Sequence, residues 1–237
     1  MMFLGTLVNC FAVIAGSGIG LLVKKGISEK ISTSIMNALA LCVLYIGVNG
    51  AFECQNVLVV IVSMALGTFI GEWIDLDARL DGLGQRLENS LGKGKEKGSI
   101  SSGFVAASLL FCVGAMTIVG SLQSGISGNH ETLFAKSLID GIAGMVLASA
   151  LGIGVMLSAV FVLVYQGLIT LCAGFLEPVL TEVIVCEMTA VGSLLVVGLS
   201  FNMLKITKIK VMNSVPAMFV PIAVYWGIEL FNYVFGG

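Results

Sequence analysis

Charged residues are scarce in this sequence. Asp, Glu, Lys and Arg make up 11% of the 237 residues, whereas a soluble globular domain carries about 25%. This shortage excludes an ordinary soluble fold. Histidine occurs once, and the six cysteines stand apart with no CxxC pair, which is typical of small apolar packing residues rather than of metal or redox groups. We therefore expect no metal site and no cofactor.

Catalytic and nucleotide-binding motifs are also missing. The chain has no HExxH and no GxSxG, and no predicted span holds paired aspartates at helical spacing, so nothing indicates an intramembrane enzyme and we name no catalytic residue. The one glycine- and lysine-rich stretch, GKGKEKGS, does not match the GxxxxGK[ST] pattern of a phosphate-binding loop. These absences also argue against ATP-driven transport by this chain.

Long apolar runs fill most of the sequence, whose mean hydropathy is +1.05. A run of about 20 residues crosses the hydrocarbon core of a bilayer as a helix, and continuous apolar runs do not alternate as barrel strands do. We predict a polytopic all-α membrane protein that forms a single transmembrane domain over 1–237. The eight expected spans are 3–23, 31–52, 55–74, 102–122, 136–155, 157–176, 185–204 and 213–234. The apolar run from 137 to 174 is divided in two because one helix of that length would greatly exceed the bilayer, and we expect the turn at Gly152–Gly154.

The basic residues give the orientation. With both termini outside, eleven of the twelve lysines and arginines fall in inner loops and only Lys136 lies outside. Positive charge on the inner side is the general rule for membrane proteins. An inner segment over 75–101 begins with leucines spaced three and four apart and ends in the glycine–lysine stretch. We predict an amphipathic surface helix and a tether there, either as a passive connector or as a partner-binding element.

A short internal similarity suggests a repeat. The segment SIMNALA at 34–40 aligns without a gap to SLIDGIA at 137–143, so that Asn37 corresponds to Asp140. The units 1–74 and 102–178 would begin on opposite sides of the membrane, with two further helices over 183–237. This arrangement is a 3+3 inverted repeat, a common plan of secondary transporters. The alternative is that apolar sequence of low complexity aligns with itself by chance.

Four polar side chains inside the predicted spans are the candidate substrate-binding residues: Asp140, Asn37, Gln166 and Thr117. A charge inside the bilayer usually faces a cavity or a partner. Asp140 follows Lys136 by four residues, so the two share a helix face and form either a solvated ion pair at the outer mouth or, if Asp140 faces the bundle, a proton or cation site. For Asn37, Gln166 and Thr117 the alternative is a hydrogen bond between helices.

Several runs carry a resemblance. CVGAMTIVGSLQSG, KSLIDGIAG, LGIGV, YQGLITL, TKIKVMNSVPA and LGTFIGEWIDLD resemble the YqgA/YdfK-like bacterial inner-membrane family over essentially the whole chain. The family is classed as a domain of unknown function, so the resemblance implies a multi-pass protein of the bacterial plasma membrane and no particular substrate. Many members have an aspartate where this chain has Ser124.

Two functions remain open from the sequence. One is a secondary transporter that moves a small solute or ion by alternating access. The other is a non-transporting scaffold or sensor that binds a partner through the inner amphipathic helix. The expected partners are the lipid bilayer and a small solute or ion, with no nucleic acid, and the glycine-rich helix faces are also compatible with a homo-oligomer.

Overall fold

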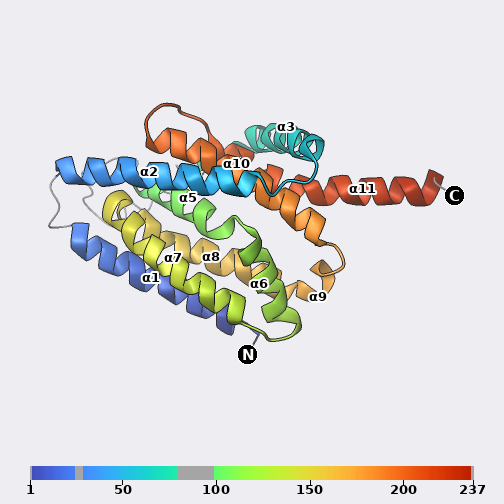
Figure 1. Cartoon of the computed structure of the whole chain (residues 1–237), viewed down its shortest axis with the longest axis horizontal. Coiled ribbons are helices and arrows are strands. Elements are labelled where there is room, and N and C mark those ends of the chain that lie inside the picture. Colours follow the sequence, from blue (N-terminus) through green and yellow to red (C-terminus); the bar gives the residue numbers. More distant parts are fainter. Residues whose placement is uncertain (1, 25–28, 80–98, 236–237) are drawn as a thin grey trace.

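The computed structural model describes residues 2–24, 29–79 and 99–235, and all regular elements within these ranges are helices (Figure 1). In chain order they are α1 (Leu4–Lys24), α2 (Glu29–Ala51), α3 (Val57–Ile74), α5 (Ser99–Cys112), α6 (Ala115–Ile126), α7 (Glu131–Leu151), α8 (Gly154–Leu171), α9 (Ala173–Leu176), α10 (Glu182–Met203), the 3-10 helix η1 (Val211–Phe219) and α11 (Val220–Phe235). The predicted all-helical class is confirmed for these residues.

Within the described ranges, seven helical segments are each long and apolar enough to cross a membrane, and the bent pair α5–α6 makes an eighth if it is counted as one span. The predicted turn between the fifth and sixth spans is confirmed: α7 ends at Leu151 and α8 begins at Gly154. Gly152 between them has φ +83°, a conformation that favours glycine.

The fourth predicted span, 102–122, differs from the structure. Helices α5 and α6 meet at an angle of 63°, and Gly114 at the junction has φ +118° and ψ 149°. Residues with a side chain rarely adopt this backbone conformation, so glycine ends one helix and turns the chain into the next. Fourteen residues of α5 precede the break and twelve of α6 follow it, which places the break near the middle of the span.

The helices pack in an order that differs from their order in the chain. Helix α1 lies against α7 and α8, α2 lies against α10, and α3 lies against η1 (Figure 1). Helix α10 also contacts α3, α5, α6, η1 and α11, so it runs through the interior of the bundle. The buried apolar core, which includes Phe111, Val155 and Val196, lies among these helices.

The predicted inverted repeat stays a prediction. One local difference between the two units is that the first helix of the first unit, α1, is continuous, whereas its counterpart is broken at Gly114. The predicted amphipathic helix and tether over 75–101 lie largely outside the described residues, which stop at 79 and resume at 99.

The two ends of the bundle are distinguished by their loops. The lysine end carries residues 204–210 together with the first turns of α2 and α5 and the last turn of α7. The opposite end carries residues 52–56, 127–130 and 177–181. Positive-inside bias predicts that the lysine end faces the cytoplasm.

Candidate functional site

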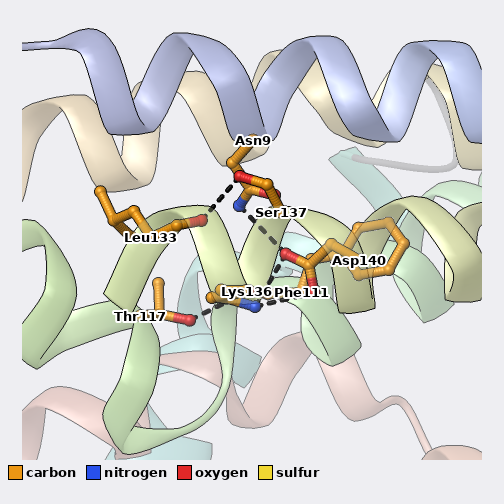
Figure 2. Close-up of polar contacts among 7 residues, drawn as sticks. All are labelled: Asn9, Phe111, Thr117, Leu133, Lys136, Ser137 and Asp140. Atoms are coloured by element: carbon orange, nitrogen blue, oxygen red, sulfur yellow. Dashed lines mark hydrogen bonds and ion pairs between the residues drawn. The ribbon is translucent and has the colours of Figure 1, made fainter. Parts of the chain in front are cut away.

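A buried ion pair lies inside the bundle on α7. Asp140 is 3% exposed and Lys136 is 6% exposed, and the Lys136 ammonium lies 2.8 Å from each carboxylate oxygen of Asp140 (Figure 2). Both members of the pair are therefore buried rather than solvated in this structure. Helix α7 begins at Glu131, five residues before the predicted span, and the Glu131 amide donates a hydrogen bond to the side-chain oxygen of Asn129. This earlier start moves Lys136 into the helix and Asp140 to its middle.

A third polar side chain completes the cluster. Asn9 of α1 is fully buried and donates a hydrogen bond from Nδ2 to Oδ2 of Asp140 at 3.0 Å (Figure 2). The side-chain oxygen of Asn9, Oδ1, has no hydrogen-bond partner among the described residues. The Asp140 carboxylate thus receives one cationic and one neutral donor, as a buried charge requires.

Close packing of α1 on α7 brings Asn9 to Asp140. A Cβ atom at Gly16 would overlap the carbonyl oxygen of Gly141, and one at Gly20 would overlap that of Met145. Small residues allow two membrane helices to approach backbone to backbone. Residue numbers increase in the same direction along both sides of the interface, so α1 and α7 are parallel. Their polar residues Asn9 and Asp140 therefore lie at the same level of the bundle.

The broken helix α5–α6 passes beside the ion pair. The Thr117 hydroxyl donates to the Phe111 carbonyl oxygen across the break at 3.1 Å, next to Lys136 in Figure 2. Cys112, the last residue of α5, lies within electrostatic range of both Lys136 and Asp140. Helix ends leave backbone groups without helical partners, and in a membrane such ends are found where they line a polar site. Thr117 is therefore a residue of the break, bonded across it to the end of α5.

Gln166 is separate from this cluster. It lies on α8, is fully buried, and neither of its amide atoms has a hydrogen-bond partner among the described residues. One turn later on α8, the Thr170 backbone packs against Gly125 of α6. The Ser121 and Thr170 hydroxyls also lack partners within the described part of the chain. Buried polar groups without partners often hold ordered water.

Asn37 lies away from Asp140. Its side chain is exposed on α2, because this helix turns Ala40, Val43 and Gly47 toward the bundle and the Ser200 hydroxyl bonds the Ala40 carbonyl. Asn37 falls outside that stripe. Asn37 stays a site residue predicted from the sequence, and its side chain is exposed in this structure whereas that of Asp140 is buried.

Asn9 and Glu187 are buried polar residues that are not among the site residues predicted from the sequence. Asn9 could have been found as the only amide side chain in the first predicted span, since a buried carboxylate needs donors. Glu187 of α10 is fully buried, and its Oε1 accepts the backbone amides of Gln55 and Asn56 at 3.0 and 2.7 Å. These amides precede α3, so Glu187 fixes the start of that helix.

Two cavities lie along the seam between α2, α5 and α10. One, of about 510 Å³, opens at the lysine end, and the other, of about 200 Å³, lies toward the opposite end. Val113 and Gly114 at the helix break line the smaller cavity. Val43 of α2 and Ala107 of α5 stand in their helices between residues that line one cavity and residues that line the other, and both belong to the buried apolar core.

The described residues contain no group of three or more His, Cys, Asp or Glu side chains placed to hold a metal ion. The chemistry that the site offers is one carboxylate whose charge is balanced by an internal ammonium. A proton or a metal cation that binds Asp140 would compete with Lys136.

Comparison with known proteins places the chain in a family. It is 30% identical over 235 residues to the "Uncharacterized membrane protein YdfK" of Bacillus subtilis (strain 168), covering 98% of this chain and 99% of that protein. It is 27% identical over 230 residues to the "Uncharacterized protein YqgA" of Escherichia coli (strain K12), covering 95% and 98%. No solved structure matches the chain. Residues 4–226 match the family described as "Protein of unknown function (DUF554)", and the chain belongs to that family.

Proposed function

We propose that this protein is a secondary transporter of a small solute or ion, coupled to a proton or a cation that binds at Asp140. The observation that carries the proposal is a span broken at Gly114, which lines the smaller cavity, with both halves of the span in contact with α7, the helix of the buried Lys136–Asp140 pair. Discontinuous helices at the bilayer midplane are the usual site of substrate and coupling ion in secondary transporters.

The two cavities support a solute path along the α2–α5–α10 seam. Each cavity has walls from the same three helices, and buried apolar side chains such as Val43 and Ala107 stand between the two linings. In the proposed path these side chains would form the barrier that closes the seam to water and ions, and alternating access would open one cavity to the solute at a time. The solute would pass along the seam, and the broken helix α5–α6 would change conformation to let it through.

The ion pair supplies the coupling step. When a proton or cation neutralises Asp140, the Lys136 ammonium loses its partner in a buried place. An unpaired buried charge is strongly unfavourable, so Lys136 must find other acceptors. Helix α5 contacts α7, and in the proposed step the ammonium would turn to the carbonyl groups at the end of α5, which would shift the break.

Reconstituted vesicles test the proposal. Purified protein in proteoliposomes is given an inward proton or sodium gradient, and uptake is measured for a panel of amino acids, organic acids, sugars and inorganic ions. We expect gradient-driven uptake of at least one solute, lost in Asp140→Asn and kept in Glu131→Gln, which alters an exposed carboxylate on the same helix. Uptake by Asp140→Asn equal to that of the wild type would contradict the assignment of Asp140.

The scaffold alternative depends on residues 80–98, which lie outside the described part of the chain. No contact among the described residues favours it. It stays a prediction from the sequence, along with the bacterial plasma membrane as the location and both termini outside.

A further inference from the structure

The larger cavity has a wall of basic side chains. Its volume is about 510 Å³, within the range of small-molecule sites. The polar and charged residues that line it are Asp77, Ser101, Ser102, Asn202, Lys205, Lys208 and Lys210. We call it the lysine pocket. Three ammonium groups and one carboxylate leave the lining with a net positive charge.

The loop that carries the lysines is held in a fixed conformation by one side chain. Asn202 donates from Nδ2 to the Ile209 carbonyl at 2.7 Å, and its Oδ1 accepts the Ile209 amide at 2.9 Å and the Thr207 hydroxyl at 2.8 Å. At the start of the loop, Lys205 has φ +59°, a left-handed conformation uncommon for a residue with a side chain. The lysines are therefore presented by a structured loop.

Two of the three lysines are not neutralised by a neighbour. Lys210 lies 3.7 Å from Glu72 and 3.9 Å from Asp75. Among the described residues, no carboxylate forms an ion pair with Lys205 or Lys208. Two positive charges at the mouth of a cavity attract an anion and raise its local concentration.

The opposite wall of the pocket comes from α5 and α10. Ser101 and Ser102 of α5 are among its polar residues. Deeper in, the lining becomes apolar, with Met36, Val105 and Leu199. The pocket thus combines a basic mouth with an apolar interior.

We propose that the lysine pocket binds a phosphate or carboxylate group that carries an apolar portion, with the anion at Lys205 and Lys208 and the apolar portion against α5 and α10. If the anion bound in this pocket is the transported solute, the substrate is a small organic anion, and this part of the inference rests on the proposed function. The same chemistry is offered by the headgroup and first acyl carbons of an anionic lipid such as phosphatidylglycerol, and the experiment separates the two sources.

Binding is measured on the full chain in detergent micelles. The soluble probes are phenyl phosphate and benzoate, with phenol as the neutral match, titrated by calorimetry at low and high salt. The lipid probe is phosphatidylglycerol against phosphatidylcholine, counted as bound molecules by native mass spectrometry. The test variant is Lys205→Gln/Lys208→Gln, and the control is Lys30→Gln, an exposed lysine at the same end that does not line the pocket.

We expect the wild type to bind a soluble anion but not phenol, with an affinity that falls about tenfold in the double variant and less than about twofold in Lys30→Gln, because hydrogen bonds to charged groups are worth more than neutral ones. If the protein binds phosphatidylglycerol saturably and through the same two lysines, but binds none of the soluble probes, the pocket is a lipid site. Equal binding by wild type and double variant, or no anion bound by the wild type, overturns the inference.

The outcome is separable from that of the transport proposal. If the pocket binds no anion but uptake still depends on Asp140, the protein is a transporter and its substrate is not an organic anion bound at the lysine pocket. If the pocket binds an anion through Lys205 and Lys208 but the vesicles take up no solute, the pocket assignment stands and the transport proposal is contradicted.

Discussion

Asn9 and Asp140, separated by 131 residues in the chain, are joined by a hydrogen bond of 3.0 Å inside the bundle. The first helix thus contributes directly to the environment of the one carboxylate that lies mid-helix in α7. The bond depends on the glycine-lined approach of α1 to α7, and it places a helix of the first predicted unit against one of the second.

Removing the carboxylate from the ion pair should destabilise the protein. In Asp140→Asn the Lys136 ammonium stays buried without its counter-charge, and we expect a loss of about 3–5 kcal/mol in the free energy of unfolding. The double variant Lys136→Met/Asp140→Leu removes both charges and should recover most of that loss. Unfolding in detergent with increasing denaturant measures both values. A double variant less stable than Asp140→Asn would show that the pair is not the cause.

Replacing Asn9 should lower the stability of the protein, whereas replacing an exposed asparagine should not. Asn9→Ala removes a hydrogen bond to a charged group, and we expect a loss of about 1.5–3 kcal/mol. Asn37→Ala, an exposed asparagine on α2, should change stability by less than about 0.5 kcal/mol. The same denaturant titration compares them, and equal effects would contradict the structure at this contact.

The α1–α7 interface should not tolerate a methyl group. Gly16→Ala places Cβ against the Gly141 carbonyl oxygen, which is backbone and cannot rotate away. We expect a loss of about 1–3 kcal/mol from overpacking. Gly167→Ala on α8 is the control, because a Cβ there would meet nothing within 4 Å. The midpoint of thermal unfolding should fall for Gly16→Ala and remain near the wild-type value for Gly167→Ala.

The break at Gly114 should be sensitive to backbone conformation alone. A Cβ at Gly114 would meet nothing within 4 Å, yet its φ of +118° is strained for any other residue. We expect Gly114→Ala to cost about 1–3 kcal/mol and to lower the rate of gradient-driven uptake, since the break is the proposed moving element. An uptake rate equal to that of the wild type would exclude Gly114 from the transport step.

The apolar barrier between the two cavities should become leaky when it is made polar. Val43 on α2 is 3% exposed and belongs to the core cluster in that barrier. We expect Val43→Ser to admit water and to allow passive ion leak in vesicles without a solute gradient. Val48→Ser, on the same helix but exposed, should leave vesicles tight. A dye-based ion-flux assay measures both, and tight Val43→Ser vesicles would place the barrier elsewhere.

The helical class and most span positions followed from apolar run length, and the Lys136–Asp140 pair followed from a spacing of four residues. The break at Gly114 did not, because glycines are frequent in these spans and only the backbone angles distinguish this one. Asn9 was not identified as a partner because the packing of α1 on α7 brings together segments that no local pattern connects. Asn37 was given a role from an alignment that carries no information about which face of α2 is buried.

The central claim is that Asp140 binds a cation inside the membrane, and charge movement measures this without knowledge of the solute. Proteoliposomes adsorbed on a solid-supported membrane are exposed to a proton or sodium concentration jump. We predict a transient current in the wild type, in Glu131→Gln and, with altered affinity, in Asp140→Glu, and none in Asp140→Asn at equal amounts of folded protein. A current in Asp140→Asn as large as that of the wild type would contradict the account.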